Sequence, residues 1–79
     1  MSTLFDILDG IIGTDEPDTV LANEDEIINY AEACGRQIDA SQAKAIARAG
    51  RAWREQIENG DGEWSRYRHE AKQALSDID

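Results

Sequence analysis

The chain offers few side chains for catalytic chemistry, because its 79 residues include one histidine, His69, and one cysteine, Cys34. His69 is followed by Glu70, which begins the two-histidine zinc motif HExxH, but no second histidine exists to complete it. Cys34 could act as a nucleophile with His69 as its base, yet nothing in the sequence brings the two together. We therefore expect Cys34 to be a small buried core residue and the protein not to be an enzyme.

A glycine-rich acidic segment is the other place where a ligand could bind. Residues 59–63 read Asn-Gly-Asp-Gly-Glu, but their oxygen ligands do not fall at the spacing of a calcium-binding loop. A turn in which Asp61 caps the following helix explains the composition better. The sequence contains no phosphate-cradling glycine loop, so we expect neither a metal nor a cofactor.

Charged residues are abundant in this sequence, and they are distributed unevenly between its two halves. The formal net charge is −9. Residues 1–35 hold nine acidic residues and no Lys or Arg, whereas residues 36–79 hold eight acidic and eight basic residues. A surface of one sign attracts partners of the other sign and speeds their association. The first half of the chain is therefore expected to favour a basic protein surface, although an acidic face can also serve only to keep a small protein soluble.

Three of these acidic residues are evenly spaced. If one helix spans residues 18–34, Asp18, Asp25 and Glu32 lie seven residues apart on one stripe, with steps of about 10.5 Å. Duplex DNA carries about one negative charge per 1.7 Å of its axis, so aligned carboxylates could compete with it for a basic groove. The expected partner-binding residues are this stripe, its acidic neighbours and one aromatic residue: Asp15, Glu16, Asp18, Glu24, Asp25, Glu26, Tyr30 and Glu32.

A stripe of the opposite sign follows in residues 40–59, formed by Lys44, Arg48, Arg51 and Arg54. Such a stripe could contact phosphates, which makes a nucleic-acid-binding regulator a third functional hypothesis. The acidic residues in the same half and the negative net charge argue against it. We expect these side chains to be solvated or paired within the chain, and we expect no direct binding of nucleic acid.

Four helices are expected to position these charges, over about residues 3–12, 18–34, 40–59 and 62–77. The caps are Ser2 or Thr3, then Asn23 with Glu26, and Asp39 with Gln42, while Gly13 and Gly35 end helices. The third helix carries a narrow apolar seam of Ala43, Ile46, Gly50, Trp53 and Ile57, which suits antiparallel packing. Gly50 indicates that another helix crosses closely there. The sequence thus predicts an all-α, small single-domain bundle of three to four helices, in which the third and fourth helices form an antiparallel hairpin.

Only 15 of the 79 residues are Leu, Ile, Val or Phe, so the core is small and a homodimer is an open possibility. The single cysteine, the lack of a signal peptide and the lack of an apolar span predict a cytoplasmic protein that does not enter a membrane. In size and charge the chain resembles the small acidic helical proteins with which phages block host defence, such as anti-CRISPR proteins. That resemblance implies a protein-binding inhibitor that mimics nucleic acid, and the alternative is a self-associating helical adaptor or antitoxin-type protein.

Overall fold

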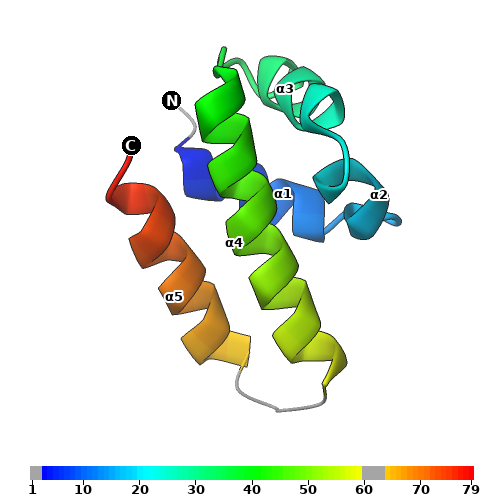
Figure 1. The fold of residues 1–79 in the computed structure, drawn as a ribbon, viewed down its shortest axis with the longest axis vertical. Coiled ribbons are helices and arrows are strands. Elements are labelled where there is room, and N and C mark those ends of the chain that lie inside the picture. The colour runs from blue at the N-terminus through cyan, green and yellow to red at the C-terminus, as the bar shows by residue number, and fades with distance from the viewer. Residues whose placement is uncertain (1–2, 60–63) are drawn as a thin grey trace.

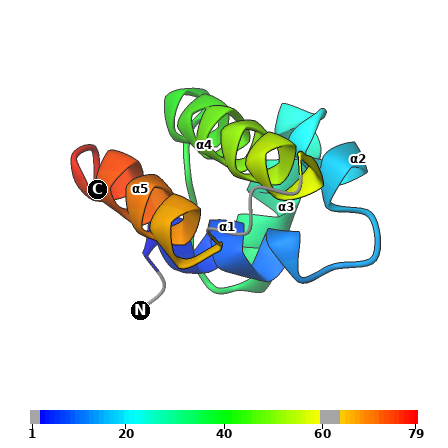
Figure 2. The same ribbon diagram turned by 90° about the horizontal axis from the view of Figure 1, so that it is seen from below.

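The computed structural model describes residues 3–59 and 64–79, which form five helices and no strand (Figure 1). The expected all-α bundle is therefore confirmed. Helices α4 and α5 lie side by side and run in opposite directions, and α1 packs against both of them (Figure 1, Figure 2). The predicted Asp61 cap lies outside the described residues. The bounds of the helices are α1 Leu4–Ile12, α2 Pro17–Leu21, α3 Glu24–Ala33, α4 Ala40–Glu58 and α5 Trp64–Ser76.

Predicted caps are present at the starts of α1 and α4 and at the end of α3. Thr3 Oγ1 accepts a hydrogen bond from the backbone N–H of Asp6 at 3.1 Å, and the Asp6 carboxylate accepts one from the N–H of Thr3 at 3.1 Å. Asp39 and Gln42 form the same reciprocal pair at the start of α4. At the end of α3, Gly35 takes a φ of +92°, and the next N–H reaches back to the carbonyl of Ala31 at 3.0 Å.

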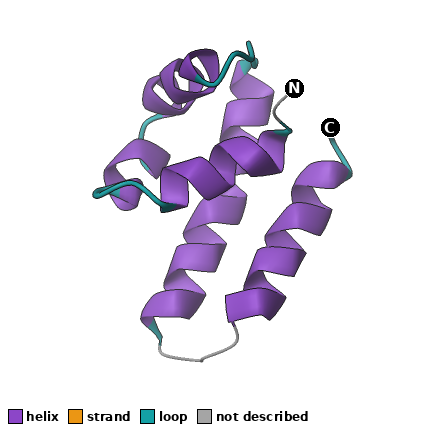
Figure 3. Ribbon diagram, turned by 180° about the vertical axis from the view of Figure 1, so that it is seen from behind, coloured by secondary structure: helices purple, strands orange, loops and turns teal. Residues whose placement is uncertain are grey.

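The single helix predicted over residues 18–34 is wrong, because the chain breaks at Asn23 into α2 and α3, which follow different axes (Figure 3). Asn23 is extended, and its side chain accepts a hydrogen bond from the N–H of Asp25 at 3.0 Å. Its own N–H donates to the carbonyl of Val20 at 3.1 Å, so Glu26 does not complete the expected capping pair.

Burial explains this break. Leu21 and Ile27 are 1% and 0% exposed. Residues six apart in a continuous helix point about 120° away from each other, so one helix could not direct both side chains into the core. Ending α2 at Leu21 and starting α3 in a new direction buries both. The stripe that was expected to join Asp18 to Asp25 and Glu32 is therefore divided between two helices.

The core lies where α1, α2, α3 and α5 meet α4. Trp53 is 2% exposed and stacks on Phe5 of α1, with ring centroids 6.1 Å apart. A Cβ added at Gly50 would lie 2.6 Å from Leu21 Cδ2 and 2.8 Å from Leu8 Cδ1. The predicted close approach at Gly50 is confirmed, and leucine side chains of α1 and α2 make it.

Cys34 departs from the expectation of a buried core residue, because its side chain is exposed. The reason is its position, since Cys34 is the C-cap of α3 and lies beyond Ala31, the last residue of that helix that is fully buried.

Candidate functional site

We use the name acidic surface for six carboxylates that lie on α3 and in the segment before α2. Glu24 is half-buried and the other five are exposed, and none of the six forms an ion pair with another described residue. Both α2 and α3 lie on the side of α4 opposite to α5 (Figure 1). The acidic surface consists of Asp15, Glu16, Glu24, Asp25, Glu26 and Glu32.

The remaining acidic residues of the first half have partners inside the chain. Asp18 accepts a hydrogen bond from Arg54 Nε at 3.2 Å, and this bond is the main reason that the pKa of the Arg54 guanidinium is raised. Asp9 lies 3.9 Å from Arg68, and Asp6 caps α1. Asp18 was expected to bind a partner. Its side chain is 64% exposed, but Arg54 already holds its carboxylate.

Tyr30 was expected to contact a partner, but its side chain is only partly accessible to solvent. It is half-buried and packs against the core. A Cβ added at Gly10 of α1 would lie 2.5 Å from the Tyr30 hydroxyl, so the absence of a side chain at Gly10 makes room for the ring. Since the two residues are twenty positions apart, no local sequence pattern indicates this contact.

The basic stripe on α4 is also divided by the fold. Lys44, Arg48 and Arg51 are exposed and line a shallow groove of about 510 Å³, which Glu24 and Glu55 also border. These three cations form no ion pair within the part of the chain that the structure describes. Arg54 lies outside the groove because it binds Asp18 and Glu58. Of the four side chains expected to be paired or solvated, Arg54 is paired within the chain, whereas Lys44, Arg48 and Arg51 are solvated.

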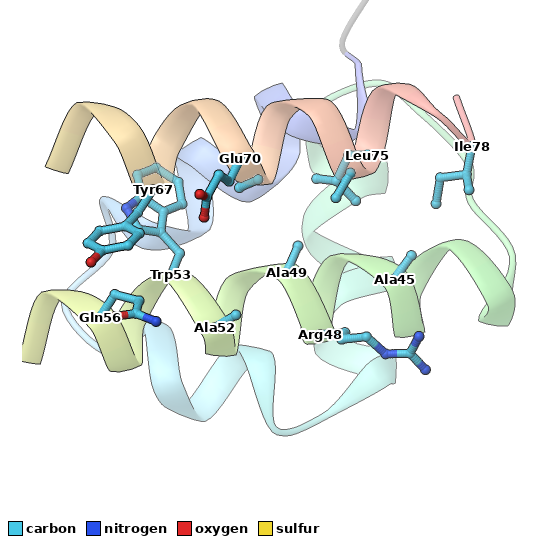
Figure 4. Close-up of a pocket in the computed structure, with 12 residues that line it drawn as sticks. Ala45, Arg48, Ala49, Ala52, Trp53, Gln56, Tyr67, Glu70, Leu75 and Ile78 are labelled. Atoms are coloured by element: carbon cyan, nitrogen blue, oxygen red, sulfur yellow. The ribbon is translucent and has the colours of Figure 1, made fainter. Parts of the chain in front are cut away.

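Sequence reasoning did not identify a second groove, which runs between α4 and α5 and encloses about 430 Å³ (Figure 4). Its lining is mostly apolar, with alanines from both helices together with Trp53, Tyr67, Leu75 and Ile78, and its polar residues are Arg48, Gln56 and Glu70. The signal that could have revealed it is a row of alanines beside the predicted seam, at the helical spacing i, i+4 and i+7. These alanines are Ala45, Ala49 and Ala52.

The structure brings together no catalytic pair from the sequence candidates. Cys34 ends α3 and His69 lies on α5, and these two helices do not pack against each other. Within residues 3–59 and 64–79, no group of three His, Cys, Asp or Glu side chains could hold a metal ion. None of the helices in these ranges is both long and apolar enough to cross a membrane. Among the described residues, the acidic surface and the apolar groove are two surface features to which a partner could bind.

Comparison of the chain with protein-family models, with curated proteins and with solved structures gave no match. The function has to be inferred from the charges and packing of the chain itself.

Proposed function

We propose that this protein is a stoichiometric inhibitor whose acidic surface docks on the basic groove of a nucleic-acid-binding protein. The observation that carries the proposal is that six carboxylates between residues 15 and 32 are left without an internal cation among the described residues. On the neighbouring helix α4, Lys44, Arg48 and Arg51 form no ion pair with these carboxylates, although Glu24 borders the groove that the three cations line. The chain therefore keeps a negative field directed at solvent, which is the property needed to attract a cationic partner.

The acidic surface is shorter than the stripe expected from the sequence. Asp25 and Glu32 still lie seven residues apart on α3 and both are exposed, which places them about 10.5 Å apart along the helix. This spacing is close to the Debye length of about 8 Å at physiological salt. Neighbouring carboxylates thus reinforce one another only in part, and binding that depends on them weakens as salt rises.

The test begins by capturing partners of the tethered protein from a lysate of the cells that make it and purifying the protein that high salt releases. Affinity for that purified partner is then measured for the wild type and for the double variant Asp25→Lys/Glu32→Lys. The control is Ser65→Lys/Gln73→Lys/Asp77→Lys, which changes the net charge equally at exposed positions on or just after α5, outside the acidic surface. We expect the first variant to weaken binding by about thirtyfold or more and the control to weaken it only a few-fold.

Two further results decide the proposal. Wild-type affinity should fall steeply with salt, and the nucleic acid of the partner should compete with this protein for the same groove. Binding that is insensitive to salt and to Asp25→Lys/Glu32→Lys would refute the electrostatic part. A complex that holds both this protein and the nucleic acid would refute inhibition by occupation of the groove.

A further inference from the structure

The groove between α4 and α5 is an apolar surface that the proposed function does not use. Ala52 and Ala74 on its walls are exposed, and Ile78 at one end is 50% exposed. Ile78 is the one large hydrophobic side chain classed as exposed in the described part of the chain. Apolar surface of this kind, bordered by charged residues, is typical of a site that another protein covers.

We propose that a second copy of this chain occupies the groove, so that two α4–α5 hairpins pack face to face and form a four-helix bundle. The two charged residues on the walls support this choice. Arg48 lies toward the Ile78 end of the groove and Glu70 lies toward the Tyr67 end (Figure 4). A two-fold interface uses the same surface on both copies, so a copy reversed end to end brings its Glu70 to the end that holds Arg48. Each groove is therefore complementary in charge to itself.

Both charged side chains are available for this pairing. Arg48 is exposed and forms no ion pair with another described residue. Glu70 contacts Arg66 one helical turn away at 3.4 Å, and both side chains of that pair are about 60% exposed. Such exposed pairs contribute little free energy, so little is lost when Glu70 turns toward a second copy.

The distribution of charge also fits this interface. Residues 36–79, which include both hairpin helices, hold equal numbers of acidic and basic residues. Helices α2 and α3, which with the segment before α2 carry the acidic surface, lie beyond α4 on the side away from α5 (Figure 1, Figure 2). Two copies joined through the groove therefore keep their negative faces apart, whereas contact through those faces would be repulsive. The dimer does not rest on the proposed function and would leave the acidic surface of each copy free.

Sedimentation equilibrium from the low to the high micromolar range tests this proposal on the intact chain. The wild type should show a reversible monomer–dimer equilibrium. Ala52→Glu and Ala74→Glu each place a charge in the groove at an exposed helical position, where Glu forms a helix nearly as well as Ala. Each should raise the dissociation constant at least about tenfold, because the interface would have to take an added carboxylate out of water. Ala40→Glu, at an exposed position of α4 outside the groove, should leave the equilibrium unchanged.

A charge exchange tests the direction of packing. Arg48→Glu alone and Glu70→Arg alone should each weaken the dimer about tenfold, and the double variant should restore it. Circular dichroism of every variant checks that the helices remain. A wild type that stays monomeric throughout the concentration range would overturn the proposal and leave the groove to a helix of another protein. Dimers that persist in Ala52→Glu and Ala74→Glu would also overturn it.

Discussion

Some single side chains link segments that are far apart in the sequence. Asp79, which follows α5, accepts hydrogen bonds from the start of α1 and from the residue that follows Gly35. Its Oδ2 accepts a hydrogen bond from the backbone N–H of Leu4 at 3.0 Å, and its Oδ1 accepts one from Arg36 at 2.5 Å. Leu4 lies in the first turn of α1, where backbone donors have no partner within the helix. The hydrogen bond from Arg36, and then the one from Leu4, lower the pKa of Asp79 below its usual value.

Asp79→Asn is therefore expected to lower the free energy of unfolding by about 1 kcal/mol at neutral pH. Because folding lowers the pKa of Asp79, the stabilisation is present above the unfolded value of about 3.9 and disappears as the pH falls through the folded value. Urea unfolding at neutral pH and at about pH 3 should show the difference from wild type shrinking in acid. Asp77→Asn is the control, since its side chain forms no hydrogen bond or ion pair with another residue that the structure describes, and an equal loss there would contradict the assignment.

The ends of the helices depend on backbone geometry at a few positions, so substitutions at these positions should affect stability in different ways. Gly35 has a φ of +92° and nothing lies within 4 Å of a Cβ placed there, so Gly35→Ala costs only backbone strain, about 1 kcal/mol. Gly13 also follows a helix, but its φ is −79°, which alanine adopts freely. Thermal unfolding should show Gly35→Ala lowering the Tm by about 4–8 °C and Gly13→Ala leaving it nearly unchanged. Equal shifts would show that the Gly35 conformation does not end α3.

Most helix ends could be predicted from the sequence because a few neighbouring residues determine them. Thr3, Asp39 with Gln42, and Gly35 act through hydrogen bonds or dihedral angles within a single turn. The break at Asn23 could not be predicted in the same way. It follows from the need to bury both Leu21 and Ile27 against other helices, and that need is set by tertiary packing.

The charge of the whole molecule is evident from the sequence, but the availability of each carboxylate is not. Asp18 and Arg54 are 36 positions apart, and only the packing of α2 on α4 brings them to 3.2 Å. The same packing leaves Asp25 and Glu32 solvated. The acidic half could thus be predicted as a candidate site from the sequence. Which of its carboxylates remain available, and the existence of the α4–α5 groove, could be seen only in the folded structure.

The last prediction concerns the effect of this charge on stability. Glu32 lies in the last turn of α3, which carries no basic residue, so its carboxylate lies at the negative end of the helix dipole. Glu32→Lys should raise the free energy of unfolding by about 0.5 kcal/mol at low salt, or the Tm by about 2–4 °C, and the gain should shrink at high salt. Glu55→Lys makes the same charge change beside Lys44, Arg48 and Arg51 and should instead destabilise the fold.

Differential scanning calorimetry of both variants at low and high salt provides the measurement. Destabilisation by Glu32→Lys would mean that the carboxylate serves the fold and would remove the main support for a binding role. Stabilisation would mean that the chain keeps Glu32 at a cost to its own stability. Because a chain of this size has little stability to spare, a carboxylate kept at such a cost would support the proposal that this surface binds a partner.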